Sequence, residues 1–194
     1  MKKIAILFTF IFLVFFCHAQ IITSVKQENG KVIFRDTVSS DLNKEEIHSR
    51  LINWLNTKLL PHSGIITSND TIQGIITCQI MDFLEMDKKA FSVFTMYVRY
   101  QLILQFFDKQ YIITIRNIYF IDPVDYQGNY TIPSQKRQYS AEFVMLQKKY
   151  NVLTVKNASN KLTDAAIQRF NEVFEMARKA VTSDSLHAEF VPEN

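Results

Sequence analysis

The chain has 194 residues and a formal net charge of +3, and 47% of its residues are hydrophobic. Two of the positive charges, Lys2 and Lys3, lie in an N-terminal leader, so the remaining chain carries only +1. Nucleic-acid binding requires a concentrated basic footprint, which this composition excludes. The length corresponds to one domain that buries roughly 70% of its unfolded surface.

The first residues have the pattern of a secretory signal peptide. Lys2 and Lys3 precede an apolar run over residues 4–16, and Ala19 supplies the small residue of a cleavage site. This run is shorter than the stretch of about 20 residues that crosses a bilayer as a helix. We therefore expect a signal peptide over residues 1–19.

The expected mature chain, residues 20–194, is a single domain exported to the periplasm or the extracellular space, with no transmembrane segment. Phe15 and Phe16 stand where a lipoprotein has small residues, so lipidation of Cys17 is the less favoured alternative. Cys78 is the one cysteine of the mature chain, so no intrachain disulfide can form. The hydrophobic core alone must then hold the fold.

A strand and a helix are predicted first along the mature chain. Residues 31–38 alternate between apolar and polar side chains, which is typical of a strand. The next stretch has apolar side chains at helical spacing: Ile47, Leu51, Trp54, Leu55 and Leu59. We expect Asn43 to cap this helix with Glu46 in a capping box, and Pro61 to end it.

The tetrapeptide Gly-Ile-Ile-Thr occurs twice, at residues 64–67 and 74–77. Asn69-Asp70 lies midway between the copies and favours a two-residue turn. Such a turn predicts a hairpin in which Ile65 lies opposite Gly74, so that large side chains face small ones.

Two long antiparallel strands are predicted over residues 94–106 and 111–121. Every even position of the first, from Phe94 to Phe106, is apolar, so we expect this face in the core. The odd positions are mostly polar and form the second face of the sheet.

Five residues of this second face are the candidate binding site. Tyr97, Arg99 and Gln101 project from one strand, and antiparallel pairing places Arg116 beside them. Gln73 has the matching parity on an earlier strand. Arg and Tyr are enriched at binding hot spots, so the face is a candidate platform for a ligand, and an ordinary solvated face is the alternative.

The C-terminal part of the chain is expected to add helices. Residues 122–160 contain prolines and a glycine and are expected as an excursion, with a helix over 139–153 and a polar linker over 157–161. Apolar side chains at helical spacing predict a further helix over 163–181. The order predicts an α+β fold, an antiparallel sheet of about five strands with helices packed on one face.

The elements over residues 30–121 can be compared with known families by their order and by the position of Trp54. They are, in sequence, GKVIFRDTV, NKEEIHSRLINWLNTKL, IQGIIT, MYVRYQLILQF and YIITIRNIYF. On these segments the chain resembles an exported bacterial domain family of unknown function with a TATA-binding-protein-like fold. The resemblance implies a β-α-β-β-β-β-α core with residues 163–181 as the last helix. It carries over no catalytic residue and no DNA binding.

The sequence contains no recognisable catalytic or metal-binding motif. No G-x-S-x-G, S-x-x-K or C-x-x-C pattern is present, and His48, His62 and His187 are not paired at helical spacing. Cys78 shares strand parity with apolar neighbours, so we expect a small buried hydrophobe. We therefore expect no enzyme activity, no metal and no cofactor.

Two functional hypotheses remain open. The first is a non-enzymatic module of the cell envelope that binds a partner protein or a glycan through the open sheet face or through residues 122–160. The second is a carrier of an apolar small molecule or lipid, with a cavity where Phe170 and Phe174 face Tyr100. A hydrolase ranks last because no motif supports it.

Overall fold

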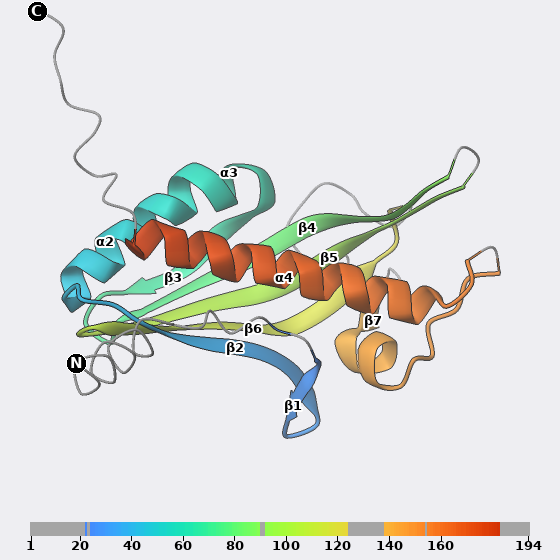
Figure 1. The fold of residues 1–194 in the computed structure, drawn as a ribbon, viewed down its shortest axis with the longest axis horizontal. Coiled ribbons are helices and arrows are strands. Elements are labelled where there is room, and N and C mark those ends of the chain that lie inside the picture. The colour runs from blue at the N-terminus through green and yellow to red at the C-terminus, as the bar shows by residue number, and fades with distance from the viewer. Residues whose placement is uncertain (1–21, 23, 90–91, 124–137, 154, 183–194) are drawn as a thin grey trace, which may run out of the picture.

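The structure is a computed structural model that describes residue 22 and residues 24–89, 92–123, 138–153 and 155–182. The expected signal peptide, Cys17, His187 and the middle of the expected excursion, residues 124–137, lie outside the described residues. The described part of the chain forms an antiparallel sheet with helices on one face (Figure 1).

The sheet has seven strands among the described residues, in the order β1-β2-β6-β5-β4-β3, with β7 beside β6. The long strands are β2 (Lys31–Ser39), β3 (Gly64–Asp70), β4 (Ile75–Lys89), β5 (Ser92–Phe107) and β6 (Gln110–Ile121). The short strands are β1 (Lys26–Glu28) and β7 (Gln138–Ser140). The five long strands confirm the predicted α+β class and the β-α-β-β-β-β-α order.

Among the described residues, two long helices cover most of one face of this sheet. They are α2 (Lys44–Trp54) and α4 (Ala158–Thr182). Helix α4 packs against β4, β2 and α2, and α2 packs against β5 and β6. Figure 1 shows α4 lying across the sheet, so the expected packing of helices on one face is confirmed.

The start of α2 is capped as predicted, but its helical path continues past Pro61. The Asn43 side chain accepts a hydrogen bond from the Glu46 N–H, and the Glu46 carboxylate accepts one from the Asn43 N–H. A π-helix, η1 (Leu55–Leu59), and a short helix, α3 (Leu60–Ser63), then follow. Pro61 lies in the first turn of α3, where a missing N–H is tolerated, so it does not end the path.

Aromatic side chains fill the layer between α4 and the sheet. The apolar even positions of β5 are all buried, as predicted. The fully buried Phe170 ring lies 5.1 Å from the Tyr100 ring and 5.1 Å from the Phe34 ring, measured between centroids. Phe174 is also fully buried. Side chains therefore occupy the place where the carrier hypothesis puts its ligand.

Cys78 lies on the same core face and is fully buried. Burial raises the pKa of its thiol to about 12. A thiol with so high a pKa is protonated at neutral pH and is a poor nucleophile, so the expectation of a small buried hydrophobe is confirmed.

The predicted register of the β3–β4 hairpin is wrong. The chain turns over residues 71–74, so Asp70 pairs with Ile75 and Ile65 pairs with Gln79. The Asp70 carboxylate accepts a hydrogen bond from the Gln73 N–H, and Gly74 adopts a left-handed φ of 73°. These two features favour a longer turn over the two-residue turn at Asn69-Asp70.

Two predicted elements of the C-terminal part differ from the structure. The helix expected over 139–153 is replaced by β7 and a single π-helical segment, η3 (Glu142–Leu146). Helix α4 begins at Ala158, inside the expected linker over 157–161. Ala158 and Leu162 are fully buried and extend the apolar stripe by one turn, which explains the earlier start.

Candidate functional site

A β-bulge in β6 shapes the sheet face that the described helices leave uncovered, which we call the uncovered face. Gln101 pairs with Arg116, but Arg99 pairs with Tyr119, so β6 has one extra residue in this interval. Asn117 lies in the bulge with a left-handed φ of 53°. Beyond it the even positions of β6 face the core, and Tyr119 joins the uncovered face.

The structure brings Gln101 and Arg116 together, as the strand parity predicted. Arg116 Nε donates a hydrogen bond of 2.9 Å to Gln101 Oε1. Asn117 Nδ2 donates a second one, of 3.1 Å, to the same oxygen. The Gln101 carbonyl therefore holds two side chains of the bulge in place.

The other predicted site residues lie in three different settings. Arg99 is only 5% exposed, since it donates a hydrogen bond to Gln138 and lies 4.9 Å from the centre of the Tyr119 ring. Tyr97 packs edge-on against Phe83, with ring centroids 5.1 Å apart. The Arg99 guanidinium is therefore buried by these contacts and is not presented to a ligand.

Gln73 does not belong to this face. It is exposed in the turn between β3 and β4, because the register of that hairpin differs from the predicted one. The strand parity from which it was inferred does not apply in a turn.

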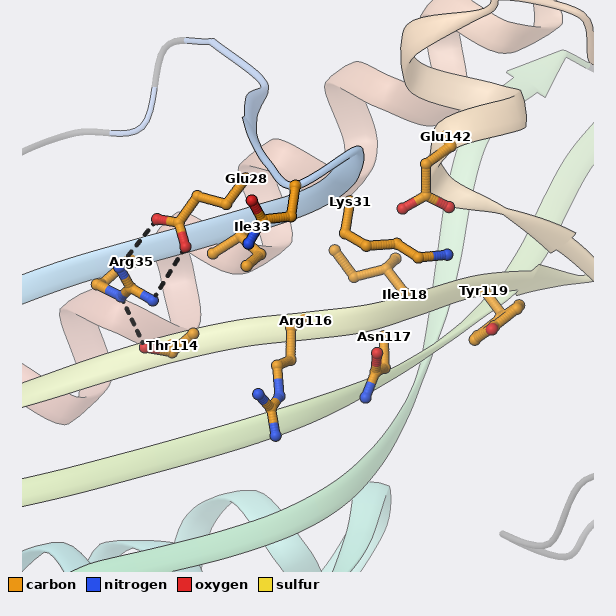
Figure 2. Close-up of a pocket in the computed structure, with 11 residues that line it drawn as sticks. Glu28, Lys31, Ile33, Arg35, Thr114, Arg116, Asn117, Ile118, Tyr119 and Glu142 are labelled. Carbon is orange, nitrogen blue, oxygen red and sulfur yellow. Dashed lines mark hydrogen bonds and ion pairs between the residues drawn. The ribbon is translucent and has the colours of Figure 1, made fainter.

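A pocket of about 330 Å³ opens on the uncovered face where β2 and β6 diverge (Figure 2). We call it the fork pocket. Its lining comes from the β1–β2 hairpin, the bulged part of β6 and η3: Glu28, Asn29, Lys31, Ile33, Arg35, Thr114, Arg116, Asn117, Ile118, Tyr119 and Glu142. A pocket of this size is within the range of small-ligand sites.

A smaller cavity of about 220 Å³ adjoins the fork pocket and shares Glu28, Ile33 and Arg35 with it. It extends past Lys26 and Thr37 along β2. The two cavities together lead from the β6 bulge toward the outer edge of the sheet.

Both acidic groups of the fork pocket are already engaged. Glu28 accepts hydrogen bonds of 2.9 and 3.4 Å from Arg35. Glu142 accepts a 2.9 Å bond from the Val32 N–H. Burial alone raises the pKa of Glu142, but the hydrogen bonds to its carboxylate and the charge of Lys31 bring it below its ordinary value.

Sequence reasoning missed most of the fork pocket. The alternation over residues 31–38 already placed Lys31 and Arg35 on one polar face, so a signal for these two existed. Tyr119 could not be found in this way, because the bulge at Asn117 reverses the strand parity.

Two further groups of charged residues lie under α4 instead of on the open face. Asp82, 5% exposed, accepts hydrogen bonds from both Arg169 and the Tyr100 hydroxyl. Burial, together with the charge of Asp82, raises the pKa of Tyr100 well above its ordinary value. Asp36 is held by Arg178 in the same manner. Each buried carboxylate is thus paired with an arginine of α4, so we interpret both groups as structural.

Within the described ranges, no group of three or more His, Cys, Asp or Glu side chains could hold a metal ion. Of the helices that the structure describes, none combines the length and the apolar character needed to cross a membrane.

The comparisons with known proteins agree with the fold. Residues 34–121 match a domain of unknown function (DUF4468) with a TBP-like fold. This part of the chain is a DUF4468 domain. It contains β2 from Phe34 onward and the bulged part of β6, whereas Glu142 and α4 follow the matched region.

Two crystal structures are similar to the whole arrangement. A DUF4468 family protein from Bacteroides ovatus has 16% sequence identity and a TM-score of 0.68, over 84% of this chain and 93% of that chain. A TBP-like protein from Parabacteroides distasonis has 18% identity and a TM-score of 0.64, over 81% of this chain and 96% of that one. The search of curated proteins found no match. At these identities the similarity shows the DUF4468 fold and no activity.

Proposed function

We propose that the protein is an exported, non-enzymatic interaction module that binds an extended segment of a partner protein on its uncovered sheet face. One observation carries the proposal: the fork pocket and the adjoining cavity lead to an edge of β2 that lacks a neighbour. Residues 34–39 of β2 pair with β6, and β1 pairs with residues 31–33. Among the described strands, none pairs with the other edge of residues 34–39.

An unpaired strand edge offers main-chain donors and acceptors to an incoming strand. The side chains beside this edge would then provide the specificity. Tyr119 and Arg116 are residue types that are enriched at binding hot spots, and Phe83 exposes 52% of its surface farther along the same face. Export is inferred from the leader over residues 1–19.

Site-specific photo-crosslinking in living cells tests this proposal. A benzoylphenylalanine residue would replace Thr37, beside the free edge, or Tyr119, in the fork pocket. The control position is Gln168, which is exposed on α4 on the opposite side of the sheet. We expect the same partner protein to be crosslinked from positions 37 and 119 and not from 168. Equal crosslinking at all three positions, or none at 37 and 119, would refute the proposed face.

A further inference from the structure

We infer that the fork pocket binds an acidic side chain of the partner segment, with the Arg116 guanidinium as its principal contact. The inference rests on the proposed function and specifies the chemistry of the partner. It follows from the charge balance of the pocket, the geometry of Arg116 and the character of the surrounding walls.

The charge balance favours an anionic group. Three cationic side chains line the fork pocket, Lys31, Arg35 and Arg116, against the two carboxylates of Glu28 and Glu142. Arg35 is engaged by Glu28. Figure 2 shows Lys31 extending toward Glu142, and its charge contributes to the low pKa of that carboxyl group. The positive charge in excess is therefore that of Arg116.

Arg116 is held in an orientation that leaves its terminal amino groups available. Only its Nε takes part in a hydrogen bond with a described residue, the one to Gln101. Gln101 is held in turn by Asn117, so the guanidinium is oriented before a ligand arrives. The remaining Nη1 and Nη2 groups match the two oxygens of a carboxylate, which is the preferred planar partner of Arg.

The walls of the pocket suit an acidic amino acid better than a bare inorganic anion. Ile33 on β2 and the Tyr119 ring on β6 contribute apolar surface to the lining. The methylene groups of a glutamate side chain would pack against this surface while its carboxylate reaches Arg116. An inorganic phosphate has no apolar part to place there.

Nuclear magnetic resonance titration of the mature domain tests the inference. The probes are a tetraglutamate peptide with both ends blocked, the matched blocked tetraglutamine peptide, inorganic phosphate and tetragalacturonic acid. We expect the glutamate peptide to shift the Arg116 Nε–Hε signal and the Asn117 and Tyr119 amide signals in a saturable manner, and the glutamine peptide to leave them in place. Replacing Arg116→Gln should weaken binding of the glutamate peptide about tenfold to a hundredfold, because a charge-assisted hydrogen bond is lost.

The charge-matched control is Lys58→Gln, an exposed lysine in η1 on the helix-covered side. It should bind the glutamate peptide as the wild type does, and an unchanged amide spectrum elsewhere shows that Arg116→Gln is folded. Equal binding of the glutamate and glutamine peptides, or preferential binding of phosphate or of the oligogalacturonide, would overturn the inference. The crosslinks from positions 37 and 119 do not require an acidic side chain in the partner, so they would still form if the inference were wrong. Failure of the inference is therefore distinguishable from failure of the proposed function.

Discussion

At the scale of single residues, Glu142 replaces a missing strand neighbour. β6 stops pairing with β2 beyond Ile115, which lies opposite Phe34. The Val32 N–H then has no ladder partner from β6, and the Glu142 carboxylate accepts its hydrogen bond. One side chain from η3 thus closes the gap that the bulge opens, and it also forms one wall of the fork pocket.

This contact predicts a pH dependence of stability. Because the pKa of Glu142 is lower in the folded state than the ordinary value of about 4.3, ionised Glu142 stabilises the fold at pH values above that figure. The contribution is lost as the pH falls through the folded-state pKa. In Glu142→Gln this contribution is absent at every pH. We expect urea unfolding to show a wild-type advantage at pH 7 that disappears toward pH 3. An advantage that stays constant with pH would contradict the electrostatic explanation.

At the scale of elements, two glycines decide the geometry of the β3–β4 hairpin. Gly74 provides the left-handed residue of the turn. Gly64 is fully extended and lies opposite Ile80, where an added Cβ would collide with the main-chain carbonyl of Gln79 and would lie 2.8 Å from Ile80 Cδ1. The expected pairing of Ile65 with Gly74 is absent, because Gly74 lies in the turn and Ile65 pairs with Gln79.

Gly64→Ala should destabilise the protein by about 1–3 kcal/mol, because a main-chain carbonyl cannot move aside as a side chain can. The control is Ser68→Ala, an exposed position in the same strand, which should stay within about 0.5 kcal/mol of the wild type. Chemical unfolding followed by circular dichroism measures both. Equal stability of the two variants would show that β3 and β4 can move apart to accept the added Cβ at no cost in free energy of unfolding.

At the scale of the whole molecule, two buried ion pairs attach α4 to the sheet. Arg169 binds Asp82 on β4, and Arg178 binds Asp36 on β2. The two arginines are nine positions apart, which places them on opposite sides of a helix with 3.6 residues per turn. Each side of α4 is thus tied to a different strand, and this fixes the rotation of the helix above the core.

Arg169→Met should destabilise the protein by about 3–5 kcal/mol, since it leaves the buried Asp82 carboxylate without its cation. The matched control is Glu172→Gln. This variant removes the exposed partner of the same arginine and should cost less than about 1 kcal/mol. Urea unfolding monitored by the fluorescence of Trp54 measures both. Similar losses in the two variants would mean that the buried pair adds no more than a surface pair.

The sequence by itself determined the elements whose pattern is local. The alternation in β5, the capping box of α2 and the apolar stripe of α4 follow from side chains that are close along the chain, and the structure confirmed each of them. The pairing of Gln101 with Arg116 also followed, because strand parity holds up to the bulge.

Only the tertiary structure decided where that parity ends and which distant groups meet. The bulge at Asn117, the turn over residues 71–74 and the contact of Glu142 with Val32 all depend on neighbours that are remote in sequence. A strand shifted by one residue exchanges its two faces, so a single bulge was enough to bring Tyr119 into the fork pocket. The candidate site therefore depends on long-range packing, which local sequence patterns do not predict.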